Sequence, residues 1–414
     1  MNILLIHQYF LEDDEPGGSR FNEMTRIWAK QGHRITVLAG AMPYVGNKKR
    51  EEYKGRFTTL KKQGDITVWR CYVSESYNAG FAGRMWGYFS FVFSSLYAGW
   101  RKLKGRYDII LVTSPPLFVG VTAYLLSRTK RIPFLFEVRD LWPESAIDTG
   151  VLKSNLLIQT AYRFEKFIYK KAVLINVLTP AFRTKLIEDK KVPAEKIIFI
   201  PNAADFSLSE QLLQTFDVER FREEHSLKGK FVIAYVGAHG IANHLQQIIE
   251  TAKLLKDTNV QFLLIGQGME KSRLMELATR MGCTNVSFID AVPKNDVFNY
   301  ILASDMGVSV LKKVDTFKTI YSNKTFDYMS CKKPVLMAID GVSRELVETA
   351  EAGVFVEPEN PKDFAAKIRI YMENPYLLKI QGNNGYNYAK NNFDRTILAN
   401  VYLQEIEKII NTHV

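Results

Sequence analysis

Two series of short apolar runs, each alternating with helical stretches, limit the folds open to this chain more than any other feature. The first series begins with residues 2–6, a helical stretch at 20–31 and a second apolar run at 35–38. Apolar runs joined by helices are typical of β-α-β units in a parallel sheet. Further runs of this series are residues 66–69, 109–112, 134–138, 175–178 and 197–200.

A charged, helix-rich segment at 208–230 separates this series from a second one, which starts at 231–236. Its later runs are residues 261–265, 286–288, 306–310, 334–338 and 353–356. At 414 residues the chain is also longer than one hydrophobic core usually organises. We therefore predict an α/β protein with two doubly wound sheets and a domain boundary near residue 205.

Composition narrows the class of protein. Apolar residues make up 47% and charged residues 24% of the chain, as in folded globular proteins rather than disordered ones. The three cysteines, Cys71, Cys283 and Cys331, lack the C-x-x-C spacing of zinc sites and suit a reducing compartment. Residues 1–40 have the pattern of strand, helix and strand rather than that of a signal peptide, so we expect a cytoplasmic protein.

The net charge of +11 favours nucleic acid, anionic lipid or phosphorylated small molecules as partners. Lys and Arg are scattered along the chain apart from residues 84–106, and the sequence contains no nucleic-acid-binding motif. Nucleic-acid-binding proteins concentrate basic residues in stripes within known modules. We therefore expect no nucleic acid partner.

Residues 81–106 combine eight aromatic and five basic side chains with no acidic one. Trp86, Phe89, Phe93 and Trp100 are among the aromatic residues. The apolar part is marginal for crossing a bilayer, but the composition fits a helix that lies on an anionic membrane surface. A core helix of the first domain with its charges outside is the alternative, and we favour the membrane surface.

Ligands of open α/β sheets bind beyond the carboxyl ends of the strands, so the loops after strands are candidate sites. Gly17 and Gly18 stand before the first helical stretch. Paired glycines let the backbone approach a ligand, and a helix N-terminus attracts anions. A flexible turn would explain the same residues.

In the second series, Gly237 and Gly240 follow the first apolar run, and Gly266 and Gly268 follow the next. Neither pair forms a complete dinucleotide-binding fingerprint. Both fit a backbone that approaches a nucleotide or its phosphates, although tight turns alone would also explain them. We favour ligand binding for Gly237 and Gly240, because two such turns follow neighbouring strands.

Residues 321–329 predict a helix start, with Ser322 or Asn323 as the cap. A diphosphate at this position would meet free amides, the helix dipole and the Lys324 ammonium. Asp327 lies one turn further on and would accept a hydrogen bond from a sugar hydroxyl. The spacing is equally compatible with a solvated surface pair of Lys324 and Asp327.

Four charges lie between residues 137 and 144, directly after a strongly apolar run. We expect charges in this position to line a cleft rather than to cover a surface. Arg139 and Asp140 are the candidates for positioning an acceptor hydroxyl or a donor phosphate.

Together these blocks resemble the family 4 glycosyltransferases, and within them the bacterial capsule and O-antigen branch that includes the L-fucosamine transferases. The matching segments are the first apolar run at 2–6 and residues 17–18, 113–117, 136–144, 201–202, 235–237, 266–268, 323–328 and 333–345. The resemblance implies the GT-B architecture, in which two Rossmann-like domains face each other across a cleft. Residues 1–204 would form the acceptor- and membrane-facing domain, completed by a crossover helix at about 395–414, and residues 205–394 would bind the nucleotide sugar.

The resemblance also implies the reaction. It implies retaining transfer of a hexose, by resemblance an N-acetylated one, from a UDP-sugar to a polyprenyl-diphosphate-linked saccharide at the inner membrane, without a metal ion or other cofactor. By position, Lys324 resembles the family's phosphate-binding lysine, and Asp327 its contact to the donor's ribose or sugar. Arg139 or Asp140 occupies the place of a histidine near the reacting centre. The Gly17-Gly18 loop would approach the donor diphosphate, and GDP remains open beside UDP.

The sequence departs from the family pattern at three places. Thr319 stands where the first of two glutamates is usual, and Asn323 replaces the serine or threonine before the lysine. An arginine common in the second-domain turn is absent, with His239 or Asn243 nearby instead. Two alternatives stay open, a UDP-sugar 2-epimerase on the same fold and a non-catalytic nucleotide-sugar-binding scaffold, the latter because of Thr319.

Overall fold

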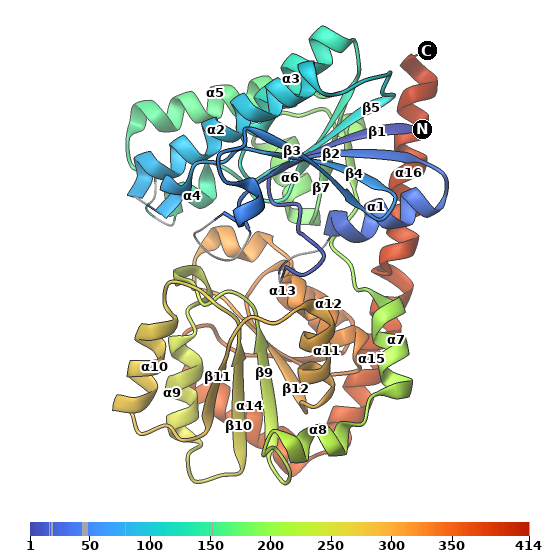
Figure 1. Cartoon of the computed structure of the whole chain (residues 1–414). Coiled ribbons are helices and arrows are strands. Elements are labelled where there is room, and N and C mark those ends of the chain that lie inside the picture. Colours follow the sequence, from blue (N-terminus) through green and yellow to red (C-terminus); the bar gives the residue numbers. More distant parts are fainter. Residues whose placement is uncertain are drawn as a thin grey trace. The chain divides into compact units, whose positions relative to one another are not determined.

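The computed structural model describes residues 1–15, 17, 20–43, 49–78, 80–148, 150 and 152–413. The chain divides into two compact units (Figure 1). Unit 1 comprises Met1–Pro201 and Thr396–Val414, and unit 2 comprises Asn202–Arg395. Each unit contains a largely parallel sheet with helices, which confirms the predicted α/β class with two doubly wound sheets.

Among the described residues, the sheet of unit 1 has eight strands in the order β3-β4-β2-β1-β5-β6-β7-β8. Its strands are β1 (Asn2–His7), β2 (Arg34–Gly40), β3 (Thr58–Gln63), β4 (Ile66–Cys71), β5 (Ile109–Thr113), β6 (Phe134–Val138), β7 (Leu174–Val177) and β8 (Ile197–Phe199). Every residue of β5 and β6 is buried. Parallel strands covered on both faces read as continuous apolar runs, which is why the sequence predicts them.

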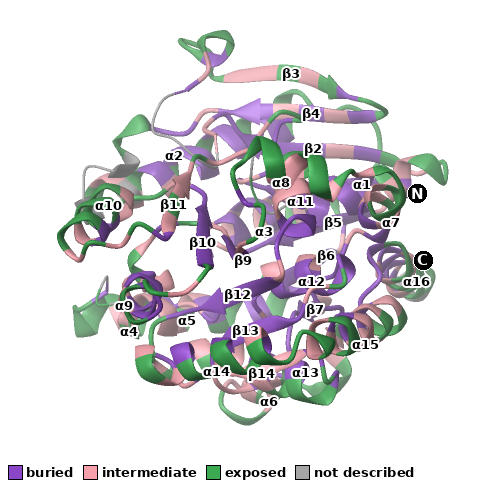
Figure 2. Cartoon of the chain, turned by 90° about the horizontal axis from the view of Figure 1, so that it is seen from below, coloured by how far each residue is buried: buried purple, intermediate pink, exposed green. Residues whose placement is uncertain are grey.

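The helices of unit 1 cover this sheet, and their outward faces are exposed (Figure 2). They are α1 (Arg20–Lys30), α2 (Gly80–Arg101), α3 (Val119–Lys130), α4 (Glu144–Asp148), α5 (Asn155–Lys171), α6 (Pro180–Glu188) and α16 (Arg395–His413). Short 3-10 turns are η1 (Glu51–Tyr53), η2 (Glu75–Asn78) and η3 (Ala194–Lys196). Within the described part of the chain, no helix is both long and apolar enough to span a membrane.

The C-terminal helix α16 packs into the core of unit 1. Ala399, Tyr402 and Ile406 are buried there, at the spacing of one helical face. The indole Nε1 of Trp28 on α1 donates to the Ala399 carbonyl at 2.9 Å, and its ring meets that of Tyr402 edge to face. The end of the chain is therefore an integral part of the unit that its beginning forms.

The strand β3 is not predicted from the sequence. It is an edge strand that pairs with β4 alone and runs antiparallel to it. Its residues, Thr-Thr-Leu-Lys-Lys-Gln, are mostly polar, so they form no apolar run. The tight turn between the two strands contains Gly64 at a φ of 58°, which favours glycine.

The six strands found in the sheet of unit 2 are all parallel, in the order β11-β10-β9-β12-β13-β14. They are β9 (Phe231–Val236), β10 (Val260–Ile265), β11 (Val286–Ile289), β12 (Met306–Val310), β13 (Val335–Ala338) and β14 (Gly353–Phe355). The helices and short turns are α7 (Phe206–Thr215), α8 (Val218–Glu224), η4 (Ile241–Asn243), α9 (Gln246–Leu254), α10 (Lys271–Arg280), α11 (Lys294–Leu302), η5 (Asp315–Thr319), α12 (Asn323–Ser330), α13 (Val342–Thr349), α14 (Pro361–Glu373) and α15 (Tyr376–Asn392).

The strand order defines a topological switch point in each sheet. In unit 1 the order reverses between β1 and β5, and in unit 2 it reverses between β9 and β12. Open α/β sheets bind ligands outside the carboxyl ends of the strands at such a point. The side chains that follow β1, β5, β9 and β12 are therefore the first place to look for a site.

Candidate functional site

In unit 2, the side chain of Lys324 lies over the carboxyl end of β9. Lys324 is the second residue of α12, and its Nζ donates to the Ser322 hydroxyl at 3.4 Å. The same Nζ is 5.0 Å from the centre of the Tyr235 ring. A Cβ atom on Gly237 would lie 3.2 Å from Lys324 Cε. Because glycine has no side chain, the Lys324 side chain has room at the switch point.

Burial lowers the pKa of Lys324 to about 8, and the charge of Asp327 opposes this shift only in part. The ammonium has thus lost much of its hydration without gaining a full counter-charge. A partly desolvated cation of this kind is favourable for an anionic ligand. Asn323 at the helix start is exposed and Asp327 is half-buried, so α12 carries all three predicted residues on its first five positions.

A chain of hydroxyl groups fixes the start of α12. The Ser322 hydroxyl donates to Ser309 Oγ at 3.3 Å, and Ser309 shares a hydrogen bond of 3.0 Å with Thr325. The Ser322 amide donates to Ser343 Oγ at 3.2 Å. Because Ser309 belongs to β12 and Ser343 to α13, these bonds hold the helix N-terminus and Lys324 at the edge of the sheet.

The two glycine turns of unit 2 pack backbone against backbone. A Cβ atom on Gly266 would lie 1.9 Å from the Gly237 carbonyl oxygen, and one on Gly268 would lie 2.3 Å from the His239 carbonyl oxygen. Gly237 and Gly266 also have φ values of 148° and 149°. Gly240 differs, because its Cβ would meet only Asn243 Oδ1, at 3.4 Å. Close packing is therefore a structural reason for Gly266 and Gly268, and ligand contact there stays a prediction.

His239 lies between these turns and is fully buried. Burial, aided by the charge of Lys271, lowers its pKa to about 4, so the ring is neutral at neutral pH. No described residue offers a hydrogen bond to either ring nitrogen. His239 therefore does not replace the positive charge of the family's arginine, which the sequence alone could not reveal.

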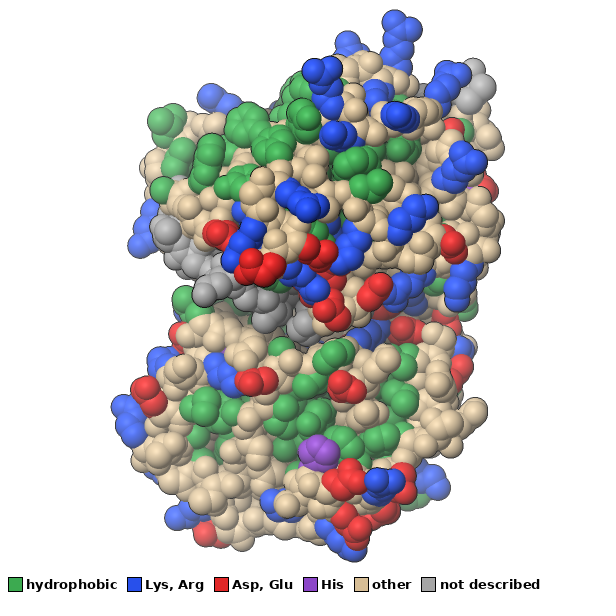
Figure 3. All heavy atoms as spheres, in the orientation of Figure 1, with side chains coloured by type: hydrophobic (Ala, Val, Ile, Leu, Met, Phe, Trp, Pro, Cys, Tyr) green, Lys and Arg blue, Asp and Glu red, His purple; other side chains and the backbone are tan. Residues whose placement is uncertain are grey.

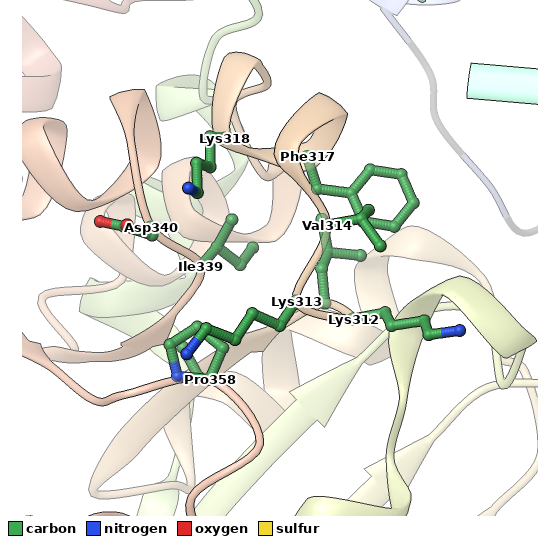
Figure 4. Close-up of a pocket in the computed structure, with 10 residues that line it drawn as sticks. Lys312, Lys313, Val314, Phe317, Lys318, Ile339, Asp340 and Pro358 are labelled. Carbon is green, nitrogen blue, oxygen red and sulfur yellow. The ribbon is translucent and has the colours of Figure 1, made fainter. Parts of the chain in front are cut away.

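A small pocket opens beside β12 and β13 in unit 2 (Figure 4). Its lining residues are Leu311, Lys312, Lys313, Val314, Phe317, Lys318, Ala338, Ile339, Asp340 and Pro358. Lys313 pairs with Glu357 at 2.5 Å and Lys318 with Asp315 at 2.8 Å. Thr319 closes η5 next to this pocket, and its hydroxyl donates to the Thr316 carbonyl at 2.6 Å.

In unit 1, Arg139 and Asp140 follow β6 and are both half-buried. The Arg139 amide donates to Ser114 Oγ at 3.4 Å, which links the ends of β6 and β5. Asp140 Oδ2 accepts a hydrogen bond from Ser145 at 2.7 Å, and burial raises the pKa of the Asp140 carboxyl. The structure therefore places both predicted residues beside the switch point of unit 1.

The expectation that all four charges of residues 137–144 line a cleft is wrong for Glu137. Glu137 is fully buried and forms two hydrogen bonds of 3.1 Å with the guanidinium of Arg20. Asn176 and Tyr402 donate to the same carboxylate at 2.9 and 3.2 Å. This carboxylate joins α1, β6, β7 and α16, so its role is structural.

The predicted loop before α1 is described only in part. Gly17 is exposed, with a φ of 146°, whereas Gly18 lies outside the described residues. The contact of this loop with a diphosphate stays a prediction.

The helix α2 exposes a stripe of aromatic side chains. Its members share one helical face and are Trp86, Phe89, Phe93, Tyr97 and Trp100. Trp86, Phe93 and Trp100 are 52%, 58% and 48% exposed. The opposite face is buried against α3, where Gly99 lets α2 approach Leu126 closely. Figure 3 shows hydrophobic side chains gathered on part of the surface of unit 1, with Lys and Arg side chains beside them.

Known families match both units. Residues 17–203 match the family described as "Glycosyl transferase 4-like domain", and residues 217–388 match "Glycosyl transferases group 1". Both family models describe domains of glycosyltransferases, so the two units are those of a glycosyltransferase. The chain belongs to the family 4 glycosyltransferases, which confirms the resemblance found in the sequence.

Curated relatives carry names from bacterial glycan synthesis. WcaI of Escherichia coli, assigned as a colanic acid biosynthesis glycosyl transferase, is 24% identical over 94% of this chain and 95% of its own. A Campylobacter jejuni protein is 20% identical over 69% of this chain and 73% of its own. Its name is N,N'-diacetylbacillosaminyl-diphospho-undecaprenol alpha-1,3-N-acetylgalactosaminyltransferase.

Solved structures share the fold. Anabaena HepE in complex with UDP-glucose has a TM-score of 0.72 and 17% identity and covers 100% of both chains. Sucrose-phosphate synthase from Thermosynechococcus elongatus has a TM-score of 0.73 and 17% identity, covering 99% of both chains. The predicted GT-B fold is thereby confirmed.

Proposed function

We propose that this glycosyltransferase moves a sugar from a UDP-sugar to a polyprenyl-diphosphate-linked saccharide, retaining the anomeric configuration and using no metal ion. The product would belong to a bacterial surface polysaccharide. The observation that carries the proposal is the position of Lys324, a partly desolvated ammonium at a helix N-terminus beside the switch point of unit 2.

The comparisons support the chemical class of both substrates. HepE has been solved with UDP and with UDP-glucose, which favours UDP over GDP for a chain of the same fold. The name of the Campylobacter relative specifies a diphospho-undecaprenol acceptor and an N-acetylgalactosaminyl donor group. We infer an N-acetylated hexose as the transferred sugar on this basis.

In the proposed mechanism, the leaving diphosphate takes the place of a counter-charge for Lys324. The amides in the first turn of α12 and the Lys324 ammonium stabilise the negative charge that develops as the sugar departs. Asp327 accepts a hydrogen bond from a donor hydroxyl, and Asn323, Gly237 and Gly240 complete the donor site with their backbone and amide groups.

Arg139 and Asp140 of unit 1 bind and orient the acceptor. The acceptor hydroxyl attacks the face from which the diphosphate departs, and the departing phosphate takes the hydroxyl proton. This step needs a cation and amides near the phosphates but no separate base. Lys324 supplies this positive charge, since His239 is neutral at neutral pH.

The proposed acceptor is lipid-linked, so the enzyme must reach a membrane. The exposed aromatic stripe of α2 and the four basic residues between 101 and 106 fit a peripheral contact with the anionic inner membrane. Tryptophan and tyrosine side chains favour the interface between acyl chains and headgroups.

A binding screen tests the donor class. Thermal unfolding is followed with UDP, GDP, ADP and their common sugars, each with and without EDTA. We expect stabilisation by UDP that EDTA leaves unchanged and that Lys324→Ala removes. A shift with GDP alone would contradict the choice of UDP, and a shift abolished by EDTA would contradict metal independence.

A product assay separates transfer from the two alternatives. Conversion of a UDP-sugar without any acceptor would indicate a 2-epimerase. UDP-sugar binding with no conversion, even with a lipid-linked acceptor in detergent, would indicate a non-catalytic scaffold, as Thr319 allows. Transfer with the same anomeric configuration in donor and product, measured by NMR, is the result that we expect.

A further inference from the structure

His7 occupies the switch point of unit 1. It is the last residue of β1. In the sheet, β5 lies beside β1, and β6 lies beside β5. Ser114 directly follows β5 and Arg139 directly follows β6, so His7, Ser114 and Arg139 lie at the carboxyl ends of three neighbouring strands. The Ser114–Arg139 hydrogen bond of 3.4 Å shows that these ends are drawn together.

The surroundings of His7 suit an apolar side chain better than an imidazole. His7 is 2% exposed, and its ring meets the buried rings of Phe10 and Phe21 edge to face, at 6.4 and 5.6 Å. Within the described residues, Nδ1 has no hydrogen-bond partner. The next side chain, Gln8, is 3% exposed, and its Oε1 likewise has no partner in that part of the chain.

Burying polar atoms without partners destabilises a fold. A phenylalanine at position 7 would keep the contacts with Phe10 and Phe21 and remove the buried Nδ1. Packing alone therefore does not explain a histidine at this position. A residue that is less favourable for the stability of the fold than another residue would be is expected at a functional site.

We propose that His7 is a further substrate-contacting residue, which forms a hydrogen bond with a hydroxyl group of the acceptor saccharide. The inference rests on the proposed function, because it assumes that unit 1 binds the acceptor while Lys324 and the glycine turns of unit 2 bind the donor.

The charge state of His7 is consistent with a hydroxyl ligand. Burial is the main cause that holds the pKa of His7 well below its ordinary range, and the charges of Arg139 and Arg70 act in the same direction. A neutral imidazole donates one hydrogen bond and accepts another, which suits a hydroxyl group, and it carries no positive charge to attract a phosphate. The neighbouring Arg139 is the group that would attract the acceptor's diphosphate.

His7→Phe tests the inference. The probes are a UDP-N-acetylhexosamine and a polyprenyl-diphosphate-linked N-acetylhexosamine in detergent. We expect the variant to unfold at the wild-type temperature or above it and to show the wild-type UDP shift. The KM for the acceptor should rise about tenfold, the effect of losing one hydrogen bond to a substrate.

Two further variants separate this role from a general effect of removing a histidine. His7→Gln keeps a neutral hydrogen-bonding group and should hold the acceptor KM within about threefold of wild type. His33→Gln is the matched control, because His33 directly precedes β2 and so lies at the amino ends of the strands, whereas His7 lies at a carboxyl end. The Nδ1 atom of His33 is 3.1 Å from the amino group of Met1. It should leave the acceptor KM unchanged.

A normal acceptor KM in His7→Phe would overturn the inference. Failure of His7→Phe to fold would overturn it as well, because it would show that packing requires the imidazole. Failure of the proposed function is seen separately, in the wild-type protein: without a UDP-induced shift there, unit 2 is not the donor site.

Discussion

At the scale of single residues, the proposed reaction depends most on one ammonium group. Lys324→Ala removes the positive charge nearest the proposed diphosphate site and should lower kcat/KM about 100-fold or more. Folding should survive, because the side chain is only half-buried and its one described hydrogen bond, to Ser322, is long at 3.4 Å. Steady-state kinetics and thermal unfolding test both statements, and near-normal turnover would remove Lys324 from the site.

The pKa of Lys324 gives a second prediction, with opposite signs for binding and stability. The folded-state value of about 8 lies below the ordinary 10.5, so between these values the folded protein binds fewer protons than the unfolded chain. The contribution of Lys324 to stability should therefore rise with pH across this window, while UDP affinity should fall. Calorimetric titrations from pH 7 to 10 measure the affinity, and Lys324→Arg should remove its decline. A UDP affinity that is constant over this range would contradict the role of the ammonium.

The glycine turns of unit 2 offer a matched pair of substitutions. Gly266→Ala forces a Cβ to within 1.9 Å of the Gly237 carbonyl and should cost about 2–4 kcal/mol of stability. Gly240→Ala meets only Asn243 Oδ1 at 3.4 Å, at an ordinary φ of −109°, and should change stability by less than about 1 kcal/mol. Urea denaturation measures both. Equal effects of the two substitutions would show that backbone crowding does not govern these turns.

At the scale of elements, the proposed membrane contact depends on the exposed aromatic stripe of α2. Replacing Trp86, Phe93 and Trp100 together by serine removes three aromatic side chains that are about half exposed, and with Trp100 the hydrogen bond of 3.0 Å from its Nε1 to the Thr129 hydroxyl. Binding to vesicles of anionic lipid should fall about 100-fold, because each ring contributes to burial in the interface. Sedimentation with vesicles measures the change.

The matched control replaces two exposed apolar residues of unit 2, Ile370 and Tyr376, by serine. This variant should bind the vesicles as the wild-type protein does. Equal loss in both variants would contradict a specific role of α2.

The elements also show what sequence can predict. Strands such as β5 and β6 are continuous apolar runs because both of their faces are buried, and the sequence therefore indicates them directly. The edge strand β3 has no such run, and only its pairing with β4 defines it. The helix at residues 80–101 could be expected from composition, but its exposed stripe depends on which face packs against α3.

The features of the candidate site that the sequence does not predict depend on contacts between residues far apart in the chain. The helix start at Lys324 is a local signal, so the sequence predicts it. The burial of Glu137 depends on Arg20, which is 117 residues away, and the neutrality of His239 depends on its packing between two separate turns. His7 has no local signal at all, because its unpartnered nitrogen appears only when Phe10 and Phe21 close around it.

At the scale of the whole molecule, the chain forms two units with separate hydrophobic cores, and the C-terminal helix α16 belongs to the first. We predict two unfolding transitions in calorimetry. Ile406→Ala, which truncates a buried side chain of α16, should lower the transition of unit 1 alone, by about 10 °C. Ile368→Ala in the core of unit 2 is the matched control and should lower the other transition.

UDP should raise only the transition that Ile368→Ala lowers, because the proposed donor site lies within unit 2. If a single transition responds to both substitutions and to UDP, the units unfold as one cooperative body, and the division of binding between them must be tested by other means than their stability.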